Sequence, residues 1–343
     1  MFSKKFKISN FTLSNNSRTL VIAEVGVNHE GNFQKCLKLI SNAKKSKADI
    51  VKLQIMNPNK NYESKTSSFK IFKKSQLSDE QIFNVYKYCS KIKMKVFSTF
   101  DREKFEFFKK IKPICYKVSS SIFYDYFFIK DLLKTGKPIL ISSGISDIDD
   151  IDYLLNLLAK NQNKKISLLH CRSLYPTSTK DLNLARIEYI RKKYNIITGF
   201  SDHSLGMDAA VSSIHHGAKI IEKHFTLDNS RKGYDHKISL EPKTFKLMVE
   251  KIRKSEEMIG MYNFSLYDNT INSKKIKKIT RRFKTTRSIK SDKFLNEKDL
   301  ELIRANSTKN YIKFNIIMDK IINKKIKKNL KPRKFLSLKD FKK

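Results

Sequence analysis

The chain up to about residue 260 alternates between short apolar runs and longer stretches of mixed polarity. Eight of the apolar runs have the length and β-branched content of buried strands, and most neighbouring runs are separated by a helix-length stretch. The predicted strands are 19–26, 49–54, 95–99, 115–119, 138–143, 166–171, 196–202 and 220–224. Buried parallel strands that alternate with helices in this way predict a (β/α)₈ barrel, the TIM-barrel fold.

Helix signals occupy much of the sequence between these runs. Helices are expected at 33–47, at 205–217, after a cap near Ser78 and after Glu241. Residues 57–75 are rich in Lys, Ser and Asn and are predicted to form a loop. The residues before Thr19 are interpreted as a polar lead-in.

The pattern changes after residue 262. Residues 263–284 are polar and basic and are typical of a linker. Beyond them, Ser288–Leu300 resembles Asn329–Phe341, at an offset of 41 residues. We therefore predict three parts, namely a barrel at 1–262, a linker at 263–284 and a small pseudo-symmetric β domain at 285–343.

The formal net charge of +39 is large enough to attract nucleic acid or another polyanion. The positive charge is mostly lysine, however, and it is spread along the whole chain. Nucleic-acid surfaces more often cluster arginine beside stacking aromatic residues. We therefore expect no nucleic-acid partner, and we expect the charge to help draw in a small anionic substrate.

The sequence contains few features that indicate a membrane or secreted location. No apolar run reaches the roughly 18 residues that a membrane span needs, and the N-terminus lacks the apolar stretch of a signal peptide. The four cysteines show no CxxC spacing, which argues against a disulfide framework or a thiolate zinc site. We expect a soluble, cytoplasmic protein with no membrane partner and with reduced, mostly buried thiols.

Polar or charged side chains come late in every predicted strand, where an apolar residue would be usual. They are Glu24, Lys52 with Gln54, Thr99, Lys117, Ser142, His170, Ser201 and His224. The carboxyl ends of barrel strands form the active-site face of this fold, and buried strands otherwise read as near-continuous apolar runs. The pattern therefore predicts one polar site at that face.

Two histidines suggest a metal at this site. His203 follows the seventh predicted strand and His224 ends the eighth, with acids at positions 202, 222 and 235 around them. Parallel strands bring both imidazoles to the same edge, where they can share a divalent ion. The alternative is that each histidine is a hydrogen-bonded structural residue.

Cationic and hydroxyl groups suggest an anionic ligand beside this ion. Lys52 and Lys117 are predicted to point into the same mouth as the hydroxyls of Ser120, Ser142 and Ser201. Such a set suits a phosphate or a carboxylate. Glu24 could serve as an acid or base nearby, so a small phosphorylated acid is the expected ligand.

Several segments resemble the N-acetylneuraminate (sialic acid) synthase family. They are 22–31, 51–54, 136–144, 170–171 with 175–176, 199–203 and 222–226. The C-terminal repeat resembles that family's antifreeze-protein-like (SAF) domain, a small β-clip-like fold, in degenerate form. The resemblance implies a transferase that condenses phosphoenolpyruvate with an N-acylated amino sugar, such as N-acetylmannosamine, and water. The implied products are a 2-keto-3-deoxy nine-carbon sugar acid, used for surface glycans, and phosphate.

The resemblance also implies roles for single residues. His203 and His224 would hold Mn²⁺ or Mg²⁺, and Glu24, Lys52 and Lys117 would be catalytic. Substrate contacts are implied for Gln54, Thr99, Ser120, Ser142, Ser173, Tyr175, Ser201, Asp235 and Arg304. The family forms domain-swapped homodimers in which the C-terminal domain caps the partner's barrel, and Arg304 matches the arginine that contacts the acyl group.

The sequence departs from the family at two places. Ile122 stands two residues beyond Ser120, where the family usually has an acid, and the nearest acid is Asp125. The Pro-Gly-Asn-Gly that usually follows the arginine is absent after Arg304. The alternatives are legionaminic or pseudaminic acid synthesis, a related barrel enzyme that uses a sugar phosphate, and a catalytically impaired homologue that binds sugars or polyanions.

Overall fold

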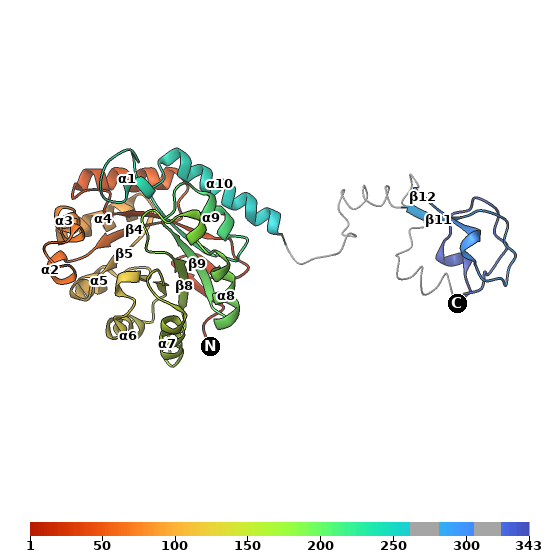
Figure 1. Cartoon of the computed structure of the whole chain (residues 1–343), viewed down its shortest axis with the longest axis horizontal. Coiled ribbons are helices and arrows are strands. Elements are labelled where there is room, and N and C mark those ends of the chain that lie inside the picture. The colour runs from red at the N-terminus through yellow and green to blue at the C-terminus, as the bar shows by residue number, and fades with distance from the viewer. Residues whose placement is uncertain (261–280, 305–323, 343) are drawn as a thin grey trace. The chain divides into compact units, whose positions relative to one another are not determined.

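The protein is described by a computed structural model that covers residues 1–260, 281–304 and 324–342 (Figure 1). The chain divides into two compact units, Met1–Gly260 and Met261–Lys343. Figure 1 shows helices arranged around the strands of the first unit. No helix within the described residues is long and apolar enough to cross a membrane.

The first unit is a closed barrel of eight parallel strands, in the order β10-β3-β4-β5-β6-β7-β8-β9. The strands are β3 (Leu20–Gly26), β4 (Ile50–Ile55), β5 (Lys95–Phe100), β6 (Tyr116–Val118), β7 (Ile139–Ser142), β8 (Ile166–Cys171), β9 (Ile197–Asp202) and β10 (Ile220–His224). Each predicted strand agrees with the observed one to within about one residue at either end. The predicted TIM-barrel fold is therefore confirmed.

Side chains along each strand point alternately out of and into the barrel. This alternation separates two apolar layers and leaves polar residues at the carboxyl ends of the strands. In β3, Val21 and Ala23 belong to the large core between the strands and the helices. Leu20 and Ile22 belong to a second core inside the barrel. Because side chains alternate with a period of two, Glu24 continues the inward row above Ile22. The same alternation places the late polar residues of the other strands inside the barrel mouth, except for His170. His170 continues the outward row of Ile166 and Leu168, and its Nε2 lies 2.7 Å from the carbonyl oxygen of Leu182. The expectation that His170 belongs to the polar site is therefore wrong.

Helices cover the outside of the barrel. They are α1 (Phe33–Lys45), α4 (Asp79–Lys91), α5 (Phe105–Ile111), α6 (Tyr126–Lys134), α7 (Ile148–Ala159), α8 (Ala185–Tyr194), α9 (Asp208–Ser213) and α10 (Pro242–Ile259). The predicted cap of α4 is confirmed, since Ser78 and Gln81 form a reciprocal capping box. The helix predicted at 205–217 is shorter than expected, because α9 ends at Ser213.

Two other predictions for the first unit are wrong. The lead-in before Thr19 forms a hairpin of β1 (Lys5–Ile8) and β2 (Phe11–Ser14), whose buried residues Phe6, Ile8 and Leu13 pack on the inner core of the barrel. The loop predicted at 57–75 contains α2 (Pro58–Asn61) and α3 (Ser67–Lys74). Side chains at Asn57 and Thr66 accept hydrogen bonds at the starts of these two helices.

The second unit has the predicted twofold repeat. Ile289 and Leu330, 41 residues apart, exchange two backbone hydrogen bonds of 3.0 and 2.8 Å. The short turns η5 (Glu297–Asp299) and η6 (Leu338–Asp340) each carry a capping box and are related by the same offset. The small core also repeats, since Leu295 and Leu336 both belong to it. These contacts fit a pseudo-symmetric β module, and its assignment as a SAF domain stays a prediction.

The boundary of this unit differs slightly from the prediction. Its sheet pairs β11 (Arg281–Thr285) with β12 (Leu300–Arg304). The last four residues of the predicted linker, 281–284, therefore belong to a strand. The remainder of the predicted linker, from 263 to 280, lies outside the described residues.

Candidate active site

A cavity of about 400 Å³ opens at the carboxyl ends of the barrel strands. Its lining brings together nearly all of the site residues predicted from the sequence: Lys52, Gln54, Thr99, Lys117, Ser120, Ser142, Ser173, Tyr175, Ser201, His203, His224 and Asp235. Glu24 contacts Lys52 at the bottom of the barrel mouth. Arg304 ends β12 in the second unit, so its predicted sugar contact stays a prediction.

The floor of the cavity is a buried charge cluster centred on Glu222. One oxygen, Glu222 Oε1, lies 2.9 Å from Lys52 Nζ and 3.2 Å from Lys117 Nζ, and it accepts a hydrogen bond of 2.9 Å from Ser201. Lys52 Nζ also lies 2.6 Å from Glu24 Oε2. Because these side chains are nearly inaccessible to water, the cluster holds both ammonium groups in fixed positions.

Burial and neighbouring charges act in opposite directions on these groups. Burial lowers the pKa of Lys52 to about 7, although the Glu222 carboxylate opposes the shift. Burial alone would raise the pKa of Glu222, but Lys117 and Lys52 hold the pKa of this carboxyl well below its ordinary value. Glu222 therefore stays ionised, whereas Lys52 is poised to change its charge near neutral pH.

Several buried polar atoms on residues that line this cavity, or on Glu24 beneath Lys52, have no hydrogen-bond acceptor or donor among the described residues. They are Glu24 Oε1, Thr99 Oγ1, Glu222 Oε2 and His224 Nδ1. Unsatisfied buried polar groups are rare in folded proteins, and a cluster of them beside a cavity points to a ligand that completes their bonding.

The two predicted metal ligands lie side by side. The ring centroids of His203 and His224 are 5.5 Å apart. His203 Nδ1 is 2.8 Å from the carbonyl oxygen of Arg172, which leaves the Nε2 atom of His203 for a ligand. Burial lowers the pKa of His224 well below its ordinary value, so its imidazole is neutral, the form that binds metals.

His203 and His224 could supply two nitrogen ligands to a divalent ion. Within the described residues, no group of three or more His, Cys, Asp or Glu side chains is arranged to hold a metal. The nearest carboxylate oxygen to His224 Nδ1 is that of Asp235, 3.6 Å away. Oxygen atoms of a substrate or of water would therefore have to supply the remaining ligands.

A second buried ion pair braces the two histidines from outside the barrel. Lys223 Nζ lies 3.0 Å from Asp202 Oδ2, and neither side chain is exposed. These residues are partners in the register of β10 and β9, and each immediately precedes one of the histidines. The acid at position 202 therefore supports His203 and does not line the cavity.

Close backbone approach shapes the serine-rich side of the cavity. The N–H of Gly144 donates a 2.8 Å hydrogen bond to Ser120 Oγ. A Cβ atom at position 144 would lie 2.5 Å from Ser120 Oγ and 2.3 Å from Ser173 Oγ, so any larger residue would displace these two hydroxyls. In the same loop as Ser173, the ring of Tyr175 stacks on His203 with centroids 4.1 Å apart.

The structure also resolves the departure at Ile122. Asp125 accepts a 2.9 Å hydrogen bond from the N–H of Phe128 and so caps α6, and it does not line the cavity. Ile122 packs at the edge of the large core. Neither residue supplies a carboxylate to the site, so Asp125 does not substitute for the missing acid.

Sequence reasoning missed some residues of the cavity wall. Tyr62 and Phe72, from the segment predicted to be a loop, stack with centroids 5.1 Å apart and line the cavity. The caps at Asn57 and Thr66 were the available signals for these helices. Glu222 was noted only as an acid near the histidines, because its three partners, Lys52, Lys117 and Ser201, come from other strands.

Comparison with known proteins identifies the family of this barrel. The NeuB family model matches residues 39–263. The chain belongs to the NeuB family. The sialic acid synthase family predicted from the sequence motifs is thereby confirmed.

Relatives in the NeuB family include enzymes named for several sugar acids. A pseudaminic acid synthase of Campylobacter jejuni is 30% identical over 313 residues, covering 87% of this chain and 90% of that protein. An N,N′-diacetyllegionaminic acid synthase of the same species is 32% identical over 260 residues, covering 71% and 78%. The crystal structure of a sialic acid synthetase from Leptospira borgpetersenii superposes with a TM-score of 0.75 at 25% identity, covering 80% of this chain and 95% of that one.

Proposed function

We propose that this NeuB family protein is a nonulosonate synthase that condenses phosphoenolpyruvate with an N-acylated amino sugar and water. The products would be a 2-keto-3-deoxy nine-carbon acid and phosphate. The observation that carries the proposal is the convergence of Lys52 and Lys117 with the His203–His224 pair in one cavity. Two fixed ammonium groups suit a small phosphorylated acid, and a neighbouring pair of imidazoles suits a divalent ion.

In this proposal the floor of the cavity binds phosphoenolpyruvate. Lys117 and Ser142, whose Nζ and Oγ atoms are 2.8 Å apart, would donate to the phosphate or carboxylate oxygens. Glu222 keeps Lys52 and Lys117 in place before the substrate arrives, so little reorganisation is needed on binding. Thr99, whose hydroxyl has no hydrogen-bond partner among the described residues, would complete the set of donors.

Carbon–carbon bond formation would take place above this floor. C3 of phosphoenolpyruvate attacks the sugar aldehyde carbon, positive charge develops at C2, and water adds there. The resulting tetrahedral adduct expels phosphate by cleavage of the carbon–oxygen bond. Glu24, an acid with one oxygen free of protein partners, would stabilise the charge at C2 and accept a proton from the water.

His203 and His224 would hold Mn²⁺ or Mg²⁺ through their free ring nitrogens. When bound, such an ion supplies Lewis-acid polarisation of the aldehyde oxygen. The stacked ring of Tyr175 would restrict the rotation of His203, and the buried pair behind the two strands would fix the separation of the histidines.

The acceptor sugar would be the precursor of N-acetylneuraminic, legionaminic or pseudaminic acid. Relatives named for the last two acids support this range of acceptors. We also propose a domain-swapped homodimer in which the C-terminal unit caps the partner's barrel and Arg304 contacts the acyl group. Mass measurement in solution tests the dimer, and Arg304→Ala should raise KM for the sugar far more than KM for phosphoenolpyruvate.

The decisive experiment is phosphate release from phosphoenolpyruvate with Mn²⁺ and a panel of acylated amino sugars, including N-acetylmannosamine. Release with one sugar, abolished by a chelator, is the expected result. Absence of release with every sugar, in folded protein that binds Mn²⁺, would contradict the proposal. It would favour instead a catalytically impaired homologue, and the specific reason is that neither Ile122 nor Asp125 supplies a carboxylate to the cavity.

A further inference from the structure

The connection between β10 and α10 carries Tyr234 and Asp235 to the cavity wall. Its regular structure is limited to one short turn, η4 (His236–Ile238). Gly233 and Tyr234 both have left-handed backbone angles, with φ of +82° and +49°. A left-handed tyrosine is disfavoured by its own Cβ, so the surrounding structure has to hold this loop in place.

Asn28 holds the backbone of Asp235. The N–H of Asp235 donates a 3.2 Å hydrogen bond to Asn28 Oδ1, and Asn28 Nδ2 donates to Ser239 Oγ at 2.9 Å. Ser239 Oγ in turn donates to the carbonyl of Asp235 at 2.7 Å. Asn28 is fully buried and lies just after β3, so the loop after β10 is tied to the loop after β3.

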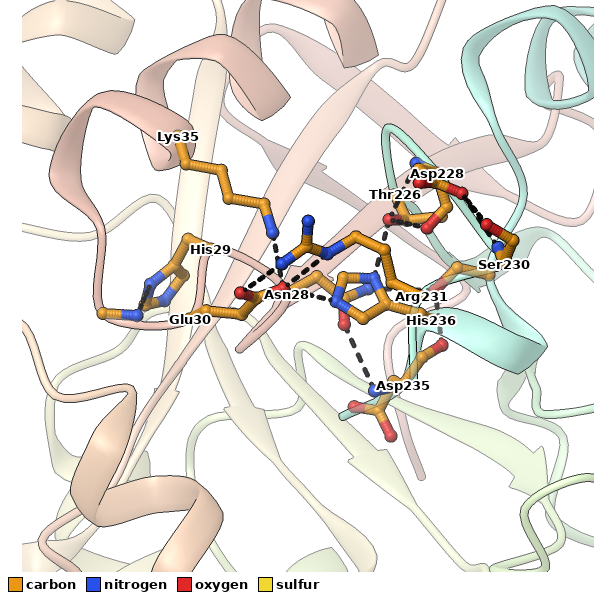
Figure 2. A network of polar contacts seen from close by, with 12 residues as sticks. Asn28, His29, Glu30, Lys35, Thr226, Asp228, Ser230, Arg231, Asp235 and His236 are labelled. Atoms are coloured by element: carbon orange, nitrogen blue, oxygen red, sulfur yellow. Dashed lines mark hydrogen bonds and ion pairs between the residues drawn. The ribbon is translucent and has the colours of Figure 1, made fainter. Parts of the chain in front are cut away.

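Glu30 grips the same loop on both sides of Tyr234 and Asp235. Arg231 donates to its two carboxylate oxygens, with Nε 3.0 Å from Oε1 and Nη2 2.7 Å from Oε2. On the other side, the fully buried ring of His236 places Nε2 2.8 Å from Glu30 Oε1. Figure 2 shows Arg231 and His236 converging on Glu30 from the loop.

Glu30 is itself anchored to a helix. Lys35 Nζ, on α1, lies 2.6 Å from Glu30 Oε1. Partial burial acts to raise the pKa of Glu30, but Lys35, Arg231 and His236 together hold it at about 2. Glu30 is therefore a permanent anion that joins α1 to the cavity loop through charge-assisted hydrogen bonds, which are stronger than neutral ones.

We propose that Glu30, acting through Arg231 and His236, is a positioning residue that fixes Tyr234 and Asp235 against the sugar side of the cavity. Lys52 and Lys117 are held by Glu222 and Ser142, independently of this loop. Loosening the loop should therefore weaken the use of the amino sugar while leaving phosphoenolpyruvate binding intact. The expected effect on the use of the sugar rests on the proposed function. The claim that Glu30 holds the loop does not.

Two variants and a matched control test the inference in the full chain. Glu30→Gln removes the negative charge of Glu30. Arg231→Gln removes one partner of Glu30, at an arginine side chain that is 48% exposed. The control is Arg18→Gln, because Arg18 forms a similar ion pair with Asp49 (2.6 Å, Arg18 50% exposed) whose residues do not line the catalytic cavity. Thermal unfolding identifies any variant that fails to fold.

Hydrogen exchange and steady-state kinetics are then compared. We expect amide protection within residues 226–239 to fall about tenfold in Glu30→Gln and Arg231→Gln but not in Arg18→Gln. KM for the sugar should rise about tenfold, while KM for phosphoenolpyruvate stays within about twofold.

Each other result overturns a defined part of the inference. Unchanged protection in both loop variants would show that Glu30 does not hold the loop. Reduced protection with an unchanged sugar KM, or with equal rises in both KM values, would refute the positioning role. If the wild-type protein released no phosphate with any sugar, the proposed function would fail, and the exchange comparison would still decide whether Glu30 holds the loop.

Discussion

The ammonium group of Lys223 lies 3.0 Å from the carboxylate of Asp202, and both side chains are completely buried. The two residues are register partners on β10 and β9, and His224 and His203 directly follow them. Lys223 also donates to the carbonyl of Ser204 at 2.6 Å. The pair therefore fixes the strand ends that carry the two histidines, and with them the geometry of the candidate metal site.

Breaking this ion pair from one side should be costly. In Lys223→Met the Asp202 carboxylate stays buried without its cation, so we expect a loss of about 3–5 kcal/mol in the free energy of unfolding. The double variant Asp202→Asn with Lys223→Met should recover most of that loss. Urea unfolding measures both variants, with Lys47→Met of the exposed Lys47–Glu250 pair as the control. A loss below about 1 kcal/mol in Lys223→Met would contradict the idea that this ion pair fixes the strand ends.

Removing the imidazoles should remove the metal and not the fold. We expect His203→Ala combined with His224→Ala to abolish Mn²⁺ binding measured by electron paramagnetic resonance, because both nitrogen ligands are lost. The far-UV circular dichroism should be unchanged. His215→Gln, at an exposed position away from the cavity, is the control and should bind Mn²⁺ normally. Normal Mn²⁺ binding by the double variant would refute the two-histidine site.

The lowered pKa of Lys52 predicts a pH dependence. Burial lowers the pKa of Lys52 to about 7, so its positive charge is present below that pH and is lost as the pH rises through it. If this cation binds phosphoenolpyruvate as proposed, kcat/KM for this substrate should fall about tenfold per pH unit above about pH 7. Lys52→Arg, which keeps its charge, should shift the fall to higher pH. A flat profile for the wild-type enzyme would exclude this role.

The C-terminal unit should lose stability independently of the barrel. Leu330 is buried in the small core and pairs with Ile289, so Leu330→Ala should destabilise this unit by about 2–5 kcal/mol. Hydrogen exchange should accelerate in residues 281–304 and 324–342 and stay unchanged in the barrel. Lys331→Ala, at the neighbouring exposed position, is the control. Accelerated exchange in the barrel strands would show that the two units do not unfold separately.

The fold could be predicted largely because the burial of a strand determines which of its residues are apolar. A strand covered on both faces has to be apolar, so a late Lys117 or Glu24 stands out against its run. The N-terminal hairpin escaped prediction because lysines occupy the outward positions of β1 while only Phe6 and Ile8 are buried, and four-residue strands are short for pattern recognition. Helix α3 escaped for a related reason, since none of its residues is fully buried.

The sequence alone determined the eight strands, their polar carboxyl ends and the family, since these depend on side-chain periodicity and local motifs. The tertiary structure decided which of those polar residues contact each other. Glu222 became the centre of the cavity floor, Asp125 became a helix cap, and Glu30 became an anchor for a loop about 200 residues further along the chain. The cap at Asp125 is a local contact with Phe128. The pairings of Glu222 and Glu30 instead arise from closure of the barrel, which brings β10 beside β3 and which no local pattern encodes.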